Sequence, residues 1–242
     1  VVSDPVIRKA INMAVDRGPI AKAVFFSAGE PANTLLNPKV QDFDPDAAKL
    51  QPSFDVDGAR RLLDEDGWKA GSDGIREKNG QRASFLLYGI QNGTNNSMMQ
   101  AMQADLRRIG IEMKIQLWDA TVAWGKLATQ EFDAFTMSYP YLSATDALSL
   151  YFPSANRPTP NRMNWVNEET DRNLLGARTA TDPANRAKLI GEVQEQITAA
   201  NVWVPLVRQQ LWLATSQRVE GARPHGVYGA ALYKGLDIRL TR

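Results

Sequence analysis

Residues 161–165 hold side chains suited to recognising a solute. They read Asn161-Arg162-Met163-Asn164-Trp165, so one guanidinium, two amides and one indole fall within five residues. A guanidinium pairs well with carboxylates, and an indole provides a flat apolar floor. We therefore expect Asn161, Arg162, Asn164 and Trp165 to orient a polar or anionic solute. The alternative is an ordered loop in which Trp165 packs on the domain and Arg162 serves the surface or a salt bridge.

The catalytic chemistry open to this chain is narrow. It contains no Cys and a single His, His225, which lies between Pro224 and Gly226. These counts exclude Cys nucleophiles, Cys-containing zinc sites and multi-histidine metal sites. His225 has no second metal ligand nearby, so we expect it to be structural. We predict no catalytic residue, no metal site and no cofactor.

An enzyme remains the main rival interpretation. The 27 acidic residues could include a carboxylate pair of the kind that glycosidases use. No spacing in the sequence supports such a pair, and the G-x-x-x-x-G-K-[ST], G-x-G-x-x-G and G-x-S-x-G motifs are missing. A carboxylate-based hydrolase such as a glycosidase is therefore kept only as an alternative.

Size and charge limit the class of protein and of partner. A chain of 242 residues that is 43% hydrophobic can bury a core. The 28 basic and 27 acidic residues leave a net charge of +1 without a basic block, so we expect no nucleic-acid partner. No apolar stretch approaches the length of about 18 residues that indicates a membrane span. The start of the chain has neither Met nor a signal pattern, and we expect a piece of a longer protein.

Three strands and an intervening helix define the expected sheet. Residues 84–89 form a short apolar run bounded by glycine, residues 111–118 alternate with period two, and residues 132–139 form a third strand. Between the first two strands, Met98, Met99 and Met102 recur at helical spacing, which favours core filling over a metal site. A strand, a helix and a strand in this order predict a right-handed βαβ unit.

Helix caps and further strands complete the expected elements. Capping residues stand at Asp4, Asp55, Asp119, Asn167 and Asp182. The helix after Asp119 carries Trp124, which we expect in the core. Residues 29–45 are rich in Gly, Pro and Asn and predict a long irregular segment. Residues 203–207 and 211–214 look like strands near the end of the chain.

Seven short motifs occur in an order that resembles a known family. They are R-x-A-I-N-x-A-x-D-R in residues 8–17, D-x-x-x-A-x-x-L-L-x-x-x-G in residues 55–67, L-x-x-I-G-I in residues 106–111, F-D-A in residues 132–134, N-x-x-x-D in residues 167–171, D-P-x-x-R in residues 182–186 and P-L in residues 205–206. Each is weak alone, but their order makes a chance match improbable. The chain resembles the C-terminal half of the family 5 extracellular solute-binding proteins, the receptors of ABC importers for oligopeptides, dipeptides, nickel complexes and some glycosides.

The resemblance implies a fold and a division of the chain. The fold is α/β, a periplasmic-binding-protein-like lobe having a mixed sheet with βαβ units and flanking helices. Residues 1–210 correspond to the second lobe of a two-lobed protein, and residues 211–242 to the segment that returns to the first lobe.

The resemblance also implies a function without catalysis. Such a protein is the substrate-binding component of an ABC importer, which buries a peptide or other small polar solute between two lobes and delivers it to a membrane permease. We accordingly expect a periplasmic or extracytoplasmic monomer that is not an enzyme. A non-transporting sensor or interaction lobe is a further alternative.

By the same resemblance, the strand ending near Ala134 and the loop after it face the cleft. Four residues are then expected to line it: Tyr139, Tyr141, Thr145 and Asp146. Peptide binders of the family commonly have a Trp near this point, followed by an acidic residue that pairs with the peptide amine. Pro140, Tyr141 and Leu142 stand here instead, which argues against a free-amine peptide. Asp146 either replaces that carboxylate or caps the helix that contains Leu148.

Overall fold

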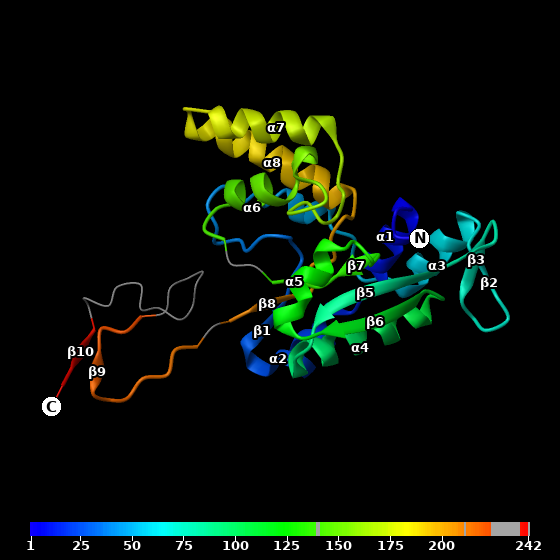
Figure 1. The fold of residues 1–242 in the computed structure, drawn as a ribbon, viewed down its shortest axis with the longest axis horizontal. Coiled ribbons are helices and arrows are strands. Elements are labelled where there is room, and N and C mark those ends of the chain that lie inside the picture. Colours follow the sequence, from blue (N-terminus) through cyan, green and yellow to red (C-terminus); the bar gives the residue numbers. More distant parts are fainter. Residues whose placement is uncertain (139–140, 211, 224–237, 242) are drawn as a thin grey trace.

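The computed structural model describes residues 1–138, 141–210, 212–223 and 238–241. Its α-helices are α1 (Pro5–Ala14), α2 (Arg17–Phe25), α3 (Val56–Glu65), α4 (Gly93–Arg108), α5 (Ala120–Ala128), α6 (Ala144–Tyr151), α7 (Glu168–Thr179) and α8 (Pro183–Ala199). Its strands are β1 (Gly29–Pro31), β2 (Lys69–Ala70), β3 (Arg76–Lys78), β4 (Gln81–Arg82), β5 (Ser84–Ile90), β6 (Glu112–Trp118), β7 (Ala134–Phe135), β8 (Val207–Gln209), β9 (Val219–Glu220) and β10 (Arg239–Leu240). Short 3-10 turns span Phe26–Ala28, Ala47–Leu50 and Ser154–Asn156. The elements form a sheet layer, a helical layer and a departing C-terminal segment (Figure 1).

The central sheet is parallel and has the order β6-β5-β7. Strand β5 pairs with β6 from Ser84↔Glu112 to Ile90↔Trp118, and α4 makes the crossover between them. The expected βαβ unit is thereby confirmed. Strand β7 is shorter than the expected 132–139, since the Asp133 side chain rather than the backbone accepts the Leu86 N–H at 2.7 Å.

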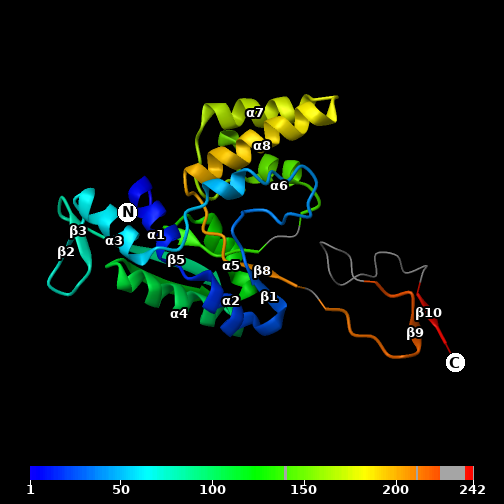
Figure 2. The same cartoon turned by 180° about the vertical axis from the view of Figure 1, so that it is seen from behind.

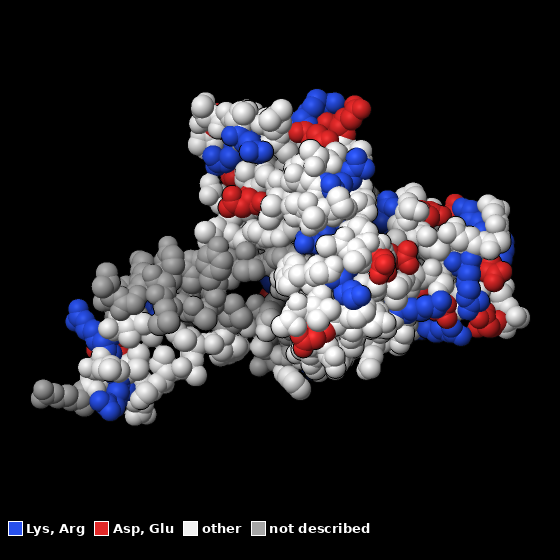
Figure 3. All heavy atoms as spheres, viewed as in Figure 1, with Lys and Arg blue, Asp and Glu red and all other residues white. Residues whose placement is uncertain are grey.

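Antiparallel pairing occurs outside the central sheet. Strands β2, β3 and β4 form one small sheet, β1 pairs with β8, and β9 pairs with β10. The α/β class with flanking helices is confirmed, and the parallel and antiparallel pairings are divided between separate sheets. Figure 3 shows side chains of both charges gathered at the end of the molecule that carries β2 and β3, whereas the middle of that face is largely uncharged.

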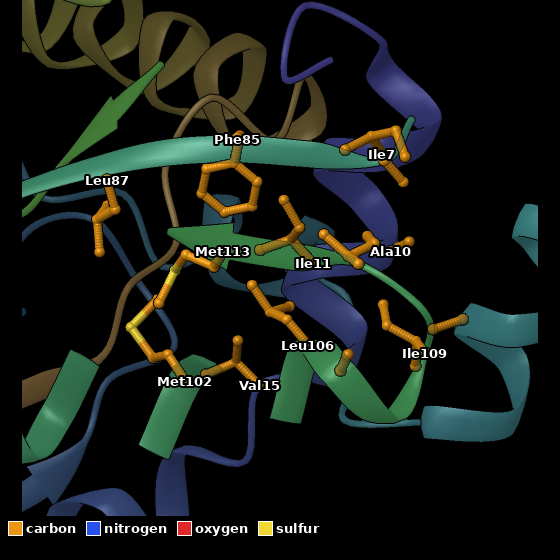
Figure 4. Close-up of a cluster of buried hydrophobic side chains, with 14 of the residues drawn as sticks. Ile7, Ala10, Ile11, Val15, Phe85, Leu87, Met102, Leu106, Ile109 and Met113 are labelled. Atoms are coloured by element: carbon orange, nitrogen blue, oxygen red, sulfur yellow. The ribbon is translucent and has the colours of Figure 1, made fainter. Parts of the chain in front are cut away.

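One hydrophobic core lies between the central sheet and the N-terminal helices. Ile7 and Ile11 of α1, Leu106 of α4, Phe85 of β5 and Met113 of β6 meet there (Figure 4). All five are at most 6% exposed. Met98, Met99 and Met102 are also buried in this core, which confirms their predicted packing role.

A second core holds the helical layer together. Leu148 of α6, Leu174 of α7, and Ile190 and Val193 of α8 are each at most 2% exposed and belong to one cluster. Figures 1 and 2 show α6, α7 and α8 grouped on one side of the central sheet, with the C-terminal segment running away from both layers. The chain thus contains two apolar cores whose relative placement depends on the segments that cross between them.

A buried polar network joins α1 to one such crossing segment. Arg17 Nε donates to the Pro205 carbonyl at 2.6 Å, and Arg17 Nη2 donates to Asn12 Oδ1 at 3.0 Å. Asn12, which is fully buried, donates from Nδ2 to the Trp203 carbonyl at 3.1 Å. Burial lowers the pKa of Arg17. Asn12 and Arg17, both from the first sequence motif, therefore hold residues 203–205 against α1.

These contacts explain where the expected strands differ. Residues 203–206 are not a strand, because side chains of α1 and α2 take the backbone carbonyls of Trp203 and Pro205 and Pro205 has no N–H to donate. The strand β8 starts only at Val207. Residues 212–214 are irregular, and Leu211 lies outside the described residues.

The predicted caps are confirmed. Asp4, Asp55, Asp119, Asn167 and Asp182 each accept a backbone N–H of the first helical turn. In the part of the chain that is described, no helix is both long and apolar enough to cross a bilayer.

Candidate functional site

The carboxyl ends of the three parallel strands meet at one edge of the central sheet. Strand β5 ends at Ile90, β6 ends at Trp118, and Thr136 follows β7 directly. Ligands of open α/β sheets bind outside this edge. A narrow cavity of about 10 Å³ lies here, enough for one polar atom or one water. It is lined by Tyr88, Gly89, Ile90, Trp118, Ala123, Leu127 and Thr136.

Buried polar atoms near this edge lack partners within the described residues. They are the indole nitrogen of Trp118, the hydroxyl oxygen of Thr136 and the amide oxygen of Asn96 in the first turns of α4. Most buried polar atoms of native proteins are hydrogen-bonded, so each of these calls for an explanation. A solute or an ordered water placed at the strand ends would supply the missing partners.

Aromatic side chains cover the sheet face beside α5. The ring centroid of Tyr88 lies 5.7 Å from that of Trp118 and 5.4 Å from that of Phe132. The ring centroids of Phe132 and Phe135 are 5.5 Å apart. Lys126 Nζ of α5 lies 4.6 Å from the Trp118 ring centroid. The surface beside the strand ends is therefore aromatic and carries a positive charge.

Arg162 is stacked on Trp124, the indole of α5. The guanidinium carbon lies 5.4 Å from the ring centroid, and Arg162 Nε is buried without a hydrogen-bond partner among the described residues. Trp124 is 47% exposed, so the expectation that it belongs to the core was wrong. The α5 residues that pack inward are Ala123 and Leu127, and Trp124 and Lys126 lie on opposite sides of that inward face.

The rest of residues 161–165 builds the loop that presents Arg162. Asn161 is fully buried, donates to the carbonyls of Pro153 and Trp165 at 3.1 and 2.9 Å, and accepts the Trp165 N–H at 3.1 Å. Asn164 has a left-handed φ of 54° and donates to Gln130 Oε1 at 2.8 Å. Trp165 packs against the second core, and its indole N–H donates to Thr170 at 3.4 Å.

The residues expected from the loop after β7 are partly dispersed. Tyr139 lies outside the described residues, as does His225. Tyr141 packs against the second core and its hydroxyl is hydrogen-bonded to that of Tyr151. Thr145 donates its hydroxyl to Asp42 Oδ2 at 3.2 Å.

Asp146 lies in the first turn of α6 and is exposed. The cap of that helix is Ser143, whose hydroxyl accepts the Asp146 N–H at 3.0 Å. The capping interpretation of Asp146 was therefore wrong, because the helix begins one residue after Ser143. The Asp146 carboxylate makes no ion pair with any residue in the described ranges.

A polar clamp holds the loop before α6. Arg186 of α8 pairs with Asp42 through Nε–Oδ2 at 2.9 Å and Nη2–Oδ1 at 3.4 Å. Gln194 donates to the Asp42 carbonyl at 2.9 Å, and the Asp42 carboxyl raises the pKa of Arg186. Next to Asp42, the Gln41 N–H donates to the Leu142 carbonyl at 3.2 Å, and the Gln41 carbonyl accepts the Ala144 N–H at 2.8 Å. The arginine of the D-P-x-x-R motif was the sequence signal for this clamp, but its partner Asp42 carried none.

The acidic groups do not suggest metal binding. Across the described ranges, no three carboxylate or imidazole groups gather closely enough to hold a metal ion. Asp119 at the strand edge caps α5, and hydrogen bonds from the Thr121 hydroxyl and backbone N–H lower its pKa. Beside Asp42, a groove of about 340 Å³ opens between residues 42–44 and α8, and its lining contains four acidic residues, one lysine and the uncharged Phe43, Ala187 and Gly191.

Residues 1–159 match the family model "Bacterial extracellular solute-binding proteins, family 5 Middle". The chain is 26% identical over 226 residues to the oligopeptide-binding protein AppA of Bacillus subtilis, covering 92% of this chain and 42% of AppA. It is 29% identical over 230 residues to the glutathione-binding protein GsiB of Salmonella choleraesuis, covering 90% of this chain and 42% of GsiB. The chain thus spans less than half the length of these relatives.

Solved structures of similar proteins share the fold. AppA of Bacillus subtilis in complex with a nonapeptide gives a TM-score of 0.83 at 22% identity, over 99% of this chain and 48% of AppA. NikA of Brucella suis in complex with Fe(III)-EDTA gives a TM-score of 0.69 at 28% identity, over 86% of this chain and 43% of NikA.

Proposed function

The chain belongs to the bacterial extracellular solute-binding proteins of family 5, and we propose that it is the second lobe of a two-lobed receptor that captures a small polar solute for an ABC importer. The family resemblance read from the seven motifs is confirmed. Its members are solute-binding proteins rather than enzymes. That this chain itself catalyses nothing is part of the proposal.

The observation that carries the proposal is the set of unpartnered polar atoms at the strand ends. The Trp118 indole N–H, the Thr136 hydroxyl and the Asn96 amide oxygen lie where open α/β sheets bind ligands. A solute enclosed between two lobes would satisfy such atoms and recover their desolvation cost of about 1–3 kcal/mol each.

The solute class follows from the relatives. AppA is described with a nonapeptide and GsiB as glutathione-binding, which favours a peptide or peptide-like solute for this chain as well. On the site, Tyr139, Asp146 and Arg162 are proposed to contact the solute. Tyr141, Thr145, Asn161, Asn164 and Trp165 are proposed to hold the contacting residues in place, since their polar groups bond within the chain.

The division of the chain and its partners are proposed on the same basis. Residues 1–210 would form the lobe, and residues 211–242 would return to a first lobe supplied by the longer protein. The described part of that segment leaves the two layers (Figure 1), which supports this division. The partners would be the solute and an ABC permease, without nucleic acid, for a monomeric protein outside the cytoplasmic membrane.

A thermal-shift screen of the full-length protein tests this function. The screen uses short peptides, glutathione and free amino acids, and each hit is then incubated with the protein and analysed by mass spectrometry. A rise in melting temperature with an unaltered ligand is expected. Conversion of a hit to a product would support the hydrolase alternative, and the absence of any hit would support a lobe that only interacts with other proteins.

A further inference from the structure

A buried carboxylate ties the first turn of α6 to a distant helix. Asp42, whose side chain is 8% exposed, accepts the Thr145 hydroxyl of α6 at 3.2 Å and Arg186 Nε of α8 at 2.9 Å. Thr145 and Arg186 lie 103 and 144 residues from Asp42 in the sequence. Asp42 therefore connects the start of α6 to α8 through side chains alone.

The residue before Asp42 holds the same turn through its backbone. Gln41 forms a parallel bridge with Ser143, the cap of α6. Its N–H and its carbonyl bond to Leu142 and Ala144, on either side of that cap. The start of α6 is thus fixed from outside by two successive residues, one acting through its backbone and the other through its carboxylate.

This arrangement decides which side chains of residues 142–146 reach the surface. Ser143 and Ala144 are 9% and 0% exposed, whereas Leu142 is 49% exposed and Asp146 is exposed as well. In extended backbone, a shift of one residue in the pairing exchanges the inward and outward side chains. The bonds from residues 41–42 therefore determine that the Asp146 carboxylate is presented to the outside.

Apolar packing alone does not fix the first turn of α6. Ala144 and Leu148 place one side of the helix in the second core. The hydrophobic effect is non-directional, whereas hydrogen bonds require set distances and angles. The core therefore keeps α6 in the helical layer, and the bonds to Asp42 determine where its first turn lies.

We propose that Asp42 and Arg186 are positioning residues of the solute site, which act through Thr145 to hold the first turn of α6 so that Asp146 meets the solute. This inference rests on the proposed function, in which Asp146 is a solute contact. Arg186 itself pairs with Asp42 and makes no contact with the solute. A contact that is held in place before the solute arrives loses less conformational freedom on binding.

Titration of the full-length protein with a mixture of tripeptides, glutathione among them, tests the inference when it is followed by native mass spectrometry. Arg186→Gln is expected to lower the apparent affinity at least about threefold, toward the lower end of the coupling found within one hydrogen-bond network. The control is Lys188→Gln, two positions along α8, where the side chain is 75% exposed. It is expected to keep the wild-type affinity.

A milder variant tests the path through α6. Thr145→Val removes the hydroxyl that donates to Asp42 and leaves the Asp42–Arg186 pair intact, and it is also expected to lower the affinity at least about threefold. Unchanged affinity in either variant, while the wild-type protein binds, overturns the inference and leaves the solute-binding function intact. If Arg186→Gln does not fold, Thr145→Val decides alone.

A double-mutant cycle separates positioning from general damage to the lobe. In an Asp146→Ala background, Thr145→Val is expected to cause no further loss of affinity, because the contact that Thr145 positions is already absent. A loss of the same size in both backgrounds overturns the inference. A wild-type protein that binds none of the tripeptides contradicts the proposed function and the inference together.

Discussion

At the scale of single residues, Arg17 illustrates a charged side chain used as a structural donor. Arg17→Met removes the donors to the Pro205 and Asn12 carbonyls and to Asn12 Oδ1. Because these acceptors are buried, we expect unfolding in urea to show a loss of about 3 kcal/mol. Lys22→Met, on the exposed side of the same helix, should change stability by less than about 0.5 kcal/mol. Equal effects of the two variants would show that the network contributes nothing.

Asp73 provides a test of the charges at the β2–β4 end. Hydrogen bonds from the Arg82 guanidinium and the Ile75 N–H lower the pKa of Asp73 to about 2. Because the folded pKa lies below the ordinary value of 3.8, this contribution to stability is present above the unfolded pKa and is lost as the pH falls toward 2. In an NMR titration, Arg82→Gln should move the Asp73 pKa upward and Arg61→Gln should not. A pKa that stays near 2 in Arg82→Gln would remove Arg82 as the cause.

Residue types alone could not show which of residues 161–165 contact the solute and which only hold the loop in place. The cluster of Asn, Arg and Trp was visible in the sequence, but the burial of Asn161 and the stacking of Arg162 on Trp124 depend on the distant helix α5. Trp124 was placed in the core because its neighbours are apolar. On a helix, a residue next to an inward-facing one can be exposed. In a short helix the sequence does not define well which residues face inward.

At the scale of elements, the start of α6 separates capping from ligand contact. Ser143→Ala removes the acceptor of the Asp146 N–H and should cost about 1 kcal/mol of stability. Asp146→Ala leaves that cap intact, so its melting temperature should match wild type while its affinity for solute falls. A large stability loss in Asp146→Ala would assign this carboxylate to the fold.

Because Asp42 pairs with Arg186, we expect the backbone amides of the loop before α6 to be protected from hydrogen exchange. In Arg186→Gln the bidentate pair is lost, and Asp42, which has a left-handed φ of 59°, keeps only the hydrogen bonds from Thr145 and Gln194. We expect faster hydrogen exchange at the Ala144 amide, which donates to the Gln41 carbonyl at 2.8 Å. Lys188→Gln, whose side chain is 75% exposed, should leave this amide protected. Unchanged exchange in Arg186→Gln would refute a positioning role.

Elements defined by local signals were predictable, and those defined by distant contacts were not. The caps at Asp4, Asp55, Asp119, Asn167 and Asp182 depend on one side chain and the next turn, and all five are found. Residues 203–206 have an apolar, strand-like composition. The carbonyls of Trp203 and Pro205 nevertheless accept hydrogen bonds from the side chains of Asn12 and Arg17, which are 191 and 188 residues away in the sequence. Side-chain donors this distant in sequence cannot be identified from the local residue pattern.

At the scale of the whole molecule, two cores and a departing segment are what we propose to be one lobe of a two-lobed receptor. The strand ends carry unpartnered polar atoms and stacked cations, while the chain spans 42% of the length of AppA. Enclosure by both lobes supplies most of the burial that offsets the entropy of association. The isolated lobe should therefore bind peptides much more weakly than the full-length protein, as calorimetry on both would show. Equal affinities would place the whole site in this lobe.

The central claim is that the full-length protein holds a solute without altering it. Native mass spectrometry of that protein, purified from its own host, measures this directly, because tight receptors often retain their cargo. We predict an added mass that leaves on denaturation as an intact small molecule. A protein that carries nothing and takes up no peptide on addition, or one that releases a chemically converted product, would contradict the account.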